Sequence, residues 1–399
     1  MKILFLCDSP NSHGGYSNQA RMLAHRLGKI HDVKYLGFQS FGHSYQMIYE
    51  GEKLNFEVIC NVSRHNFGHH SFIRKLPQLK PDIVIQLGDL WMIADNLRDP
   101  NQLQRPFAFC SLFPVDAPPL VQHQIDALRI TDIPICLTNY GKRICKDHGF
   151  DVNMIPHGLD FNISKPLNFE TVSALRGQLG LTNKKLILFV FRNQPRKVPQ
   201  VTMDAIRKSS IMKRNDAVVL FWTDPQETVP WDSDNTGWDI RQIRKEWNLI
   251  GKVILPEDLG INYDVMDGFS SVQMNQLYNC ADFGLNLTCG EGFSLTPVEQ
   301  LSVGKPVICT DATTLPEVSG PGALLIDVAY TNEAQSAGVK RFYADAKKAA
   351  EAIDTLLDNP TLCYELGQKG LEHVHKNYNA DNVAEEFIKL FDKAMGRFK

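Results

Sequence analysis

Two carboxylates around a glycine turn form the part of this sequence best suited to chemistry. Glu291 lies within the turn Gly290 to Gly292, and Glu299 stands eight positions after it. The turn lies between an apolar run, 283–288, and a helix-like run, 297–303. Backbone N–H groups of such a turn and of the following helix bind anions. A carboxylate repels phosphate but accepts hydrogen bonds from sugar hydroxyls. The pair therefore favours a nucleotide sugar over a bare phosphate as the ligand.

Two cations follow another apolar run. Arg192 and Lys197 come directly after Lys185 to Phe191, on either side of a proline turn. That separation lets both side chains converge on one anion, and a diphosphate is the natural choice. The unbroken apolar run predicts a central parallel strand. The cations should then lie at its carboxyl end, where open α/β sheets bind ligands.

The elements that must position these residues alternate between strand and helix patterns. Residues 3–7 predict a buried strand, the loop with Gly14 and Gly15 follows, and Ser17 is the expected N-cap of a helix. Further strands are expected at 82–87, 107–112, 185–191, 217–221 and 253–255. Strand, glycine loop and helix form the unit that opens a doubly wound sheet. The sequence therefore predicts an α/β protein.

The stretch 275–310, with Glu291, seven residues and Glu299, resembles the nucleotide-sugar signature of retaining GT-B glycosyltransferases of the family 4 type. Arg192, four residues and Lys197 match a second element of that family. Asn153 to Asp160 resembles the element that closes its first domain. The resemblance implies two Rossmann-like doubly wound parallel-sheet domains facing across a cleft.

The domain bounds follow from the same resemblance. We expect an acceptor domain at 1–160, a linker at 161–176 and a nucleotide-sugar domain at 177–377. The last segment, 378–399, is expected to form a helix that crosses back to the first domain.

The resemblance also assigns roles. Glu299 should bind the ribose hydroxyls and Glu291 the hydroxyls of the donor sugar. Arg192 and Lys197 should hold the diphosphate together with the backbone of one short segment, Gly292, Phe293 and Ser294. The backbone of Gly14 and Gly15 should approach the diphosphate and the acceptor.

One position departs from the family pattern. Where the family commonly carries a His-Asp pair, this sequence has Val115 and Asp116. Asp116 stays a candidate contact for a sugar hydroxyl and joins Arg192, Lys197 and Glu291 in the expected catalytic set. The missing histidine leaves the identity of the donor sugar open.

A basic segment raises the question of the acceptor. From Arg64 and His65 to Lys80 no acidic residue occurs, and Asp89 follows the next strand toward the expected cleft. We interpret Arg64, His65 and Asp89 as acceptor-side residues. An anionic acceptor, such as a phospholipid, a sugar phosphate or nucleic acid, would suit this segment, and a solvated loop is the alternative. The segment contains three histidines: His65, His69 and His70. A zinc site at these histidines is disfavoured, because no cysteine or carboxylate lies near them in the sequence.

The predicted activity is transfer of a sugar, with retention, from a UDP- or GDP-sugar to a hydroxyl acceptor. A carbohydrate or lipid-linked acceptor is the first expectation, and a hydroxylated base in DNA is an alternative. A nucleotide-sugar epimerase on the same fold is another. The resemblance implies no cofactor and no required metal. For Asp232-Ser-Asp234 we favour a flexible insert over a metal motif.

Composition agrees with an ordinary globular protein. The 399 residues are 43% hydrophobic and 22% charged, with a net charge of −3, so no overall attraction to nucleic acid is expected. The nine cysteines include no CxxC pair and predict reduced, mostly buried thiols. No apolar run is long enough for a signal peptide or a membrane span. We therefore expect a cytoplasmic protein.

Overall fold

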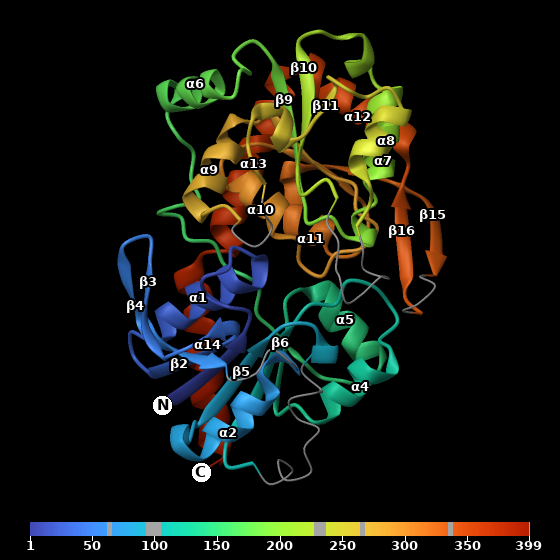
Figure 1. The fold of residues 1–399 in the computed structure, drawn as a ribbon. Helices are drawn as coiled ribbons and strands as arrows, with labels where there is room; N and C mark the ends of the chain where they lie inside the picture. The colour runs from blue at the N-terminus through green and yellow to red at the C-terminus, as the bar shows by residue number, and fades with distance from the viewer. Residues whose placement is uncertain (62–65, 93–104, 227–236, 264–267, 334–337, 399) are drawn as a thin grey trace. The chain divides into compact units, whose positions relative to one another are not determined.

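The computed structural model describes residues 1–61, 66–92, 105–226, 237–263, 268–333 and 338–398. The chain divides into two compact units. The N-terminal unit comprises Met1–Asp160 with Tyr378–Lys399, and the C-terminal unit is Phe161–Asn377 (Figure 1).

The N-terminal unit contains an eight-stranded sheet in the order β3-β4-β2-β1-β5-β6-β7-β8. All neighbouring pairs are parallel except β3 with β4. The strands are β1 Lys2–Cys7, β2 Asp32–Phe41, β3 Tyr45–Tyr49, β4 Glu52–Asn61, β5 Ile83–Leu87, β6 Ala108–Phe113, β7 Ile133–Cys136 and β8 Asn153–Met154. The helices with described bounds are α1 Gly15–Leu27, α2 His69–Leu79, α4 Gln122–Arg129, α5 Asn139–Asp147 and α14 Ala380–Phe398.

Helix α1 begins earlier than the sequence pattern predicted. Its N-cap is Gly14, and Ser17 is fully buried within the first turn instead of capping it. Ala20 and Leu23 lie on the face of α1 that packs into the core, and both side chains are buried. The capping prediction was wrong because a glycine N-cap gives no side-chain signal, whereas a serine suggests one.

The C-terminal segment returns to the N-terminal unit, where it contacts the residues after β8 and helix α1. Leu159 N–H donates to Tyr378 O over 2.7 Å, and Ala380 N–H donates to Leu159 O over 3.0 Å. A Cβ atom on Gly158 would lie only 2.7 Å from the Cα atom of Ala380, so this approach requires glycine. Helix α14 then packs on α1, where Arg26 bridges to Asp381.

The C-terminal unit contains a six-stranded sheet in the order β11-β10-β9-β12-β13-β14, and every neighbouring pair is parallel. The strands are β9 Lys185–Val190, β10 Ala217–Trp222, β11 Val253–Ile254, β12 Phe283–Asn286, β13 Val307–Thr310 and β14 Ala323–Ile326. The helices are α6 Phe169–Gln178, α7 Pro199–Lys208, α8 Ile240–Glu246, α9 Ser271–Cys280, α10 Leu295–Ser302, α11 Leu315–Ser319, α12 Ala346–Asp358 and α13 Pro360–Asn377. A separate two-stranded sheet pairs β15 Val328–Glu333 with β16 Lys340–Ala344.

The expected linker at 161–176 is not irregular throughout. Helix α6 occupies its second half, capped by the Asn168 side chain, which accepts from Thr171 N–H. No residue of α6 is buried, so the helix lacks the apolar stripe by which periodicity would reveal it. Backbone N–H groups of Lys165 and Leu167 also donate to asparagines of α9, which fixes this segment to the C-terminal unit.

Both units are thus Rossmann-like doubly wound sheets, as predicted. Eight of the nine cysteines are buried free thiols, and Cys363 is half-buried, which confirms the interpretation of the cysteines. In the described part of the chain, no helix combines the length and the apolar character that a bilayer crossing demands.

Candidate functional site

The predicted glycine turn lies at the carboxyl edge of the C-terminal sheet. It follows β12 and leads into α10, with Ser294 as the helix N-cap. Ser294 has a φ of 71°, an uncommon conformation for a residue other than glycine. Its Oγ accepts a hydrogen bond from Asn286 Nδ2 over 2.9 Å, which connects the end of β12 with the start of α10.

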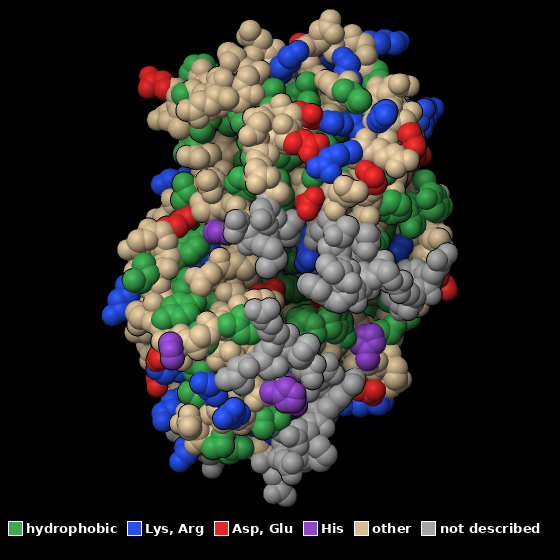
Figure 2. Space-filling model, viewed as in Figure 1, with side chains coloured by type: hydrophobic (Ala, Val, Ile, Leu, Met, Phe, Trp, Pro, Cys, Tyr) green, Lys and Arg blue, Asp and Glu red, His purple; other side chains and the backbone are tan. Residues whose placement is uncertain are grey.

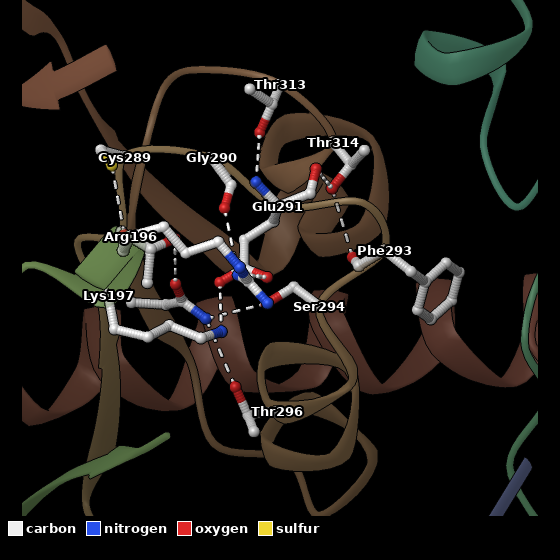
Figure 3. A network of polar contacts seen from close by, with 12 residues as sticks. Arg196, Lys197, Cys289, Gly290, Glu291, Phe293, Ser294, Thr296, Thr313 and Thr314 are labelled. Carbon is white, nitrogen blue, oxygen red and sulfur yellow. Dashed lines mark hydrogen bonds and ion pairs between the residues drawn. The ribbon is translucent and has the colours of Figure 1, made fainter. Parts of the chain in front are cut away.

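In this turn, the carboxylate of Glu291 lies between two cations that come from the loop after β9 (Figure 3). Lys197 Nζ lies 2.5 Å from its Oε1 and Arg196 Nη1 lies 2.9 Å from its Oε2. Glu291 is 3% exposed and Lys197 9%. Buried charges of this kind are tolerated only when they are paired and hydrogen-bonded, and these are.

The cations decide the protonation state of Glu291. Burial alone would raise the pKa of its carboxyl, but Arg196 and Lys197 outweigh burial and hold the pKa at about 2. The carboxylate is therefore ionised near neutral pH. It can accept hydrogen bonds but cannot serve as a general acid near neutrality.

Threonines fix the backbone of the turn (Figure 3). Glu291 N–H donates to Thr313 Oγ1 over 3.2 Å, while Thr314 Oγ1 donates to Glu291 O over 3.1 Å and lies 3.3 Å from Phe293 O. The turn is thus held by side chains from the loop after β13. Such preorganisation reduces the cost of ordering the site around a ligand.

The backbone also couples the turn to the cation loop. Cys289 N–H donates to Arg196 O over 3.0 Å, and Arg196 Nη1 donates to Gly290 O over 3.2 Å. The loop after β9 and the turn after β12 are therefore joined by main-chain contacts as well as by charge.

Glu299 has a different environment. Its Oε2 accepts a hydrogen bond from the Tyr278 hydroxyl over 2.6 Å, which joins α10 to α9. Burial raises the pKa of Glu299, and the Tyr278 hydrogen bond only partly offsets this. The two carboxylates of the predicted pair are therefore shifted in opposite directions, by cations at Glu291 and by desolvation at Glu299.

The structure brings Lys197 to the predicted turn and adds Arg196, a residue that sequence reasoning missed. Arg196 is the last of the four residues between Arg192 and Lys197, which were treated only as a spacer. A signal for Arg196 existed, since a second arginine beside Lys197 suits the same anion.

The other predicted donor-binding residues differ in their exposure. Arg192 is exposed at the end of β9, and its role stays a prediction. Gly292 and Phe293 are buried, and Figure 3 shows the Phe293 ring turned away from the Glu291 carboxylate.

In the N-terminal unit, Gly14 and Gly15 lie exposed at the start of α1. Arg21 of α1 supports the loop before them, because its Nη1 donates to Pro10 O over 2.7 Å and to Ser12 O over 3.2 Å. The Arg21 guanidinium also lies 3.6 Å from the centre of the Tyr49 ring. Arg21 is 5% exposed, and sequence reasoning did not single it out.

Asp89 and Asp116 follow β5 and β6 at the carboxyl edge of the N-terminal sheet. Asp89 Oδ1 accepts from the Tyr16 hydroxyl over 2.9 Å, which joins the loop after β5 to α1. Asp116 is half-buried beside the buried Val115. Their roles in binding stay predictions.

The basic segment is only partly described. Arg64 and His65 lie outside the described residues, as do Asp232 and Asp234. From His69 the segment forms helix α2, so in its described part the solvated-loop interpretation was wrong. Phe72 anchors α2, being fully buried and packed against Phe107 with ring centres 6.0 Å apart. Across the described residues, no group of three or more His, Cys, Asp or Glu side chains is arranged to hold a metal ion.

Comparisons with known proteins point to one class. A family model described as "Glycosyl transferase-like" matches residues 239–389, which include the glycine turn. The trehalose synthase of Rubrobacter xylanophilus is 26% identical over 127 residues, 32% of this chain and 26% of that protein. The MMP alpha-(1->4)-mannosyltransferase of Mycolicibacterium hassiacum is 27% identical over 143 residues, 35% of this chain and 32% of that protein. The matched segments thus span no more than about a third of these relatives' lengths.

Solved structures resemble the whole chain. Sucrose-phosphate synthase from Thermosynechococcus elongatus superposes with a TM-score of 0.77 at 16% identity, covering 100% of both chains. Anabaena Alr3699/HepE in complex with UDP-glucose gives 0.73 at 14% identity, covering 98% of this chain and 100% of that one. The predicted fold class is confirmed: the chain has the GT-B glycosyltransferase fold.

Proposed function

We propose that this protein is a retaining glycosyltransferase that moves a sugar from a UDP- or GDP-sugar to a hydroxyl acceptor. The observation that carries the proposal is the arrangement of Lys197 and Arg196 around Glu291 in the turn before α10. It places fixed positive charge beside an ionised carboxylate and a set of backbone N–H groups. A diphosphate needs the positive charge and the backbone N–H groups, and a sugar needs the carboxylate as a hydrogen-bond acceptor.

The charge balance suits a diphosphate leaving group. Two cations and one carboxylate leave a net positive charge in the described network, to which the exposed Arg192 can add. In the proposed reaction the bond from the anomeric carbon to the diphosphate oxygen breaks, and a bond to the acceptor oxygen forms on the same face. Negative charge grows on the diphosphate as it leaves, and Lys197 and Arg192 stabilise that charge.

No protein base is required in this scheme. The acceptor's proton passes to an oxygen of the departing phosphate, and the low pKa of Glu291, about 2, makes this side chain a poor base. Glu291 instead accepts hydrogen bonds from hydroxyls of the donor sugar, and Glu299 from those of the ribose. No metal ion is needed to neutralise the diphosphate when the lysine and arginine do so.

The names of similar proteins agree with a nucleotide-sugar donor. A mannosyltransferase and trehalose synthases are among the relatives, and HepE is solved in complex with UDP-glucose. We therefore propose UDP- and GDP-linked hexoses as the donors to examine first. A carbohydrate or lipid-linked hydroxyl is the proposed acceptor, and the described basic residues of α2 keep an anionic acceptor within the proposal.

The test begins with a thermal-shift panel of nucleotide sugars, followed by kinetics with the donor that binds. We expect Lys197→Ala to lower kcat by about 10²-fold to 10³-fold with a small change in KM, as loss of a buried oxyanion donor does. The matched control is Lys213→Ala, which removes an exposed lysine of the same unit. Unchanged kcat with raised KM would contradict the transition-state role.

Product analysis separates the remaining alternatives. Retention predicts a product with the anomeric configuration of the donor, measured by proton NMR coupling constants. Conversion of donor to an epimer without any acceptor would establish an epimerase instead. Loss of transfer after treatment with EDTA, restored by a divalent cation, would show that a metal is required.

A further inference from the structure

The two-stranded sheet β15–β16 is a part of the C-terminal unit that the proposed function does not use. Figure 1 shows this ribbon separate from the six-stranded sheet. The register pairs Tyr330 with Tyr343 and Asn332 with Arg341. An isolated hairpin is marginally stable in water, so its retention on the surface requires packing or a role.

The hairpin is attached directly to the candidate donor site. Phe342 N–H of β16 donates to Cys289 O over 2.9 Å. Cys289 N–H in turn donates to Arg196 O over 3.0 Å, and Cys289 precedes Glu291 by two positions. The hairpin backbone therefore lies one hydrogen bond from the turn that holds Glu291.

One face of the hairpin presents an aromatic stack. The rings of Tyr330 and Tyr343 lie 4.6 Å apart with their planes within 7° of parallel. Tyr330 is 57% exposed, whereas Tyr343 is half-buried and supports it. Because side chains alternate along a strand, the next pair on this face is Asn332 and Arg341. We call these four residues the tyrosine face.

We propose that the tyrosine face binds a saccharide chain and holds the acceptor beside the donor site. This inference rests on the proposed function and names the acceptor class. The exposed ring of Tyr330 offers an electron-rich surface to the C–H groups of a pyranose. The Asn332 amide and the Arg341 guanidinium offer planar sets of hydrogen-bonding groups to the hydroxyls of the saccharide.

The charge of the hairpin favours a saccharide over nucleic acid. The tyrosine face carries one cation, Arg341, and on the opposite face Lys340 pairs in register with Glu333. A single-stranded nucleic acid needs aromatic stacking together with several cations that follow its phosphates. On the face of the molecule in Figure 2, Lys and Arg side chains are interspersed with Asp and Glu over the described residues.

The experiment measures binding of neutral oligosaccharides to the full chain by saturation-transfer NMR. The probes are trisaccharides of glucose, mannose, galactose and N-acetylglucosamine. We expect one of them to bind, with at least tenfold weaker binding after Tyr330→Ala and full binding after Tyr330→Phe, which keeps the ring. Tyr364→Ala is the matched control, because Tyr364 is 66% exposed on α13, away from the hairpin in sequence.

The outcomes are separable from failure of the proposed function. Binding unaffected by Tyr330→Ala, or binding of oligo-dT in place of every trisaccharide, overturns the inference. If the wild-type protein is stabilised by a nucleotide sugar but binds no trisaccharide, the tyrosine face is rejected and the proposed function stands. If it binds a trisaccharide through Tyr330 but no nucleotide sugar, the tyrosine face stands and the proposed donor is wrong.

Discussion

The two glycine loops of this protein occupy similar places but differ in their electrostatics. Gly14 caps α1 after the loop that follows β1, and Gly15 is the first residue of that helix, whereas Gly290 to Gly292 lies between β12 and α10. The first loop is held by Arg21, which donates to the neutral carbonyls of Pro10 and Ser12. The second is held by ion pairs between Glu291 and two cations.

The difference shows that the same strand, glycine loop and helix arrangement can be stabilised in two ways. In the N-terminal unit, a buried guanidinium orders the loop, and Tyr16 joins the start of α1 to Asp89. In the C-terminal unit, the charges themselves form the site, since Glu291 and Lys197 are both buried. Under the proposed function, the C-terminal loop would bind the charged donor, and the N-terminal loop would contribute shape and hydroxyl contacts.

The largest expected effect tests whether the C-terminal turn depends on its ion pairs. Glu291→Gln leaves Lys197 buried without its carboxylate, so we expect the free energy of unfolding to fall by about 3–5 kcal/mol. Urea denaturation without ligand measures it. Glu257→Gln is the control, because Glu257 pairs with Arg241 at the surface and should cost less than about 1 kcal/mol. Equal losses in the two variants would show that the buried ion pairs of the turn contribute no more to stability than a surface pair does.

The next prediction separates the two arginines of the cation loop. Arg192 is exposed, and Arg196 already bonds to Glu291. We expect Arg192→Ala to lower kcat about 10²-fold through lost stabilisation of the leaving group. Arg196→Ala should cost only about tenfold, because it acts by positioning Glu291, and Arg196→Lys should restore part of that loss.

Single-turnover kinetics with a bound donor measures both effects. A larger loss at Arg196 than at Arg192 would move the contact with the diphosphate to Arg196. The resemblance in sequence would then have indicated the correct loop but the wrong side chain.

The pH dependence of the two units should differ as well. Burial lowers the pKa of His157 in the N-terminal unit from 6.5 to about 3. Between those values the unfolded chain binds the proton and the folded chain does not, so stability falls as the pH falls. The loss amounts to about 2 kcal/mol between pH 7 and pH 5. Glu291 has its folded pKa depressed from 4.5 to about 2, so its contribution disappears only below about pH 4.5.

Hydrogen exchange of each unit at pH 7 and pH 5 measures this difference. The N-terminal unit should lose protection first, and His157→Asn should reduce its dependence on pH because asparagine does not titrate. Equal pH sensitivity in the wild type and in His157→Asn would contradict the assignment to His157.

The smallest expected effect concerns the glycine loop of the N-terminal unit, at Gly14 and Gly15. Tyr16→Phe removes the hydrogen bond to Asp89 and should raise the acceptor KM about fivefold, corresponding to about 1 kcal/mol. Tyr364→Phe, a change at an exposed tyrosine, is the control. A large fall in kcat for donor hydrolysis after Tyr16→Phe would contradict the division of roles between the loops.

Several features were predictable because they depend on short stretches of sequence. The buried strands β1, β5, β9 and β10 are apolar runs, and the turn around Glu291 is recognisable from its glycines and flanking strand. Helix α6 was missed because it has no buried face, and the N-cap of α1 because Gly14 gives no side-chain signal. The strand β3 was also missed, since its antiparallel pairing with β4 depends on a partner.

The sequence by itself determined an α/β protein with Lys197 and Glu291 at the carboxyl ends of strands, and its resemblance to a known family implied two doubly wound sheets. Apolar periodicity and glycine placement are local, so they can be read from neighbouring residues. Only the tertiary structure decided that Arg196 joins Lys197 on Glu291, and that Tyr278 bonds to Glu299. Those contacts join segments 21 to 95 positions apart. The pKa shifts of Glu291 and Glu299 depend on burial and nearby charge, which no local pattern encodes.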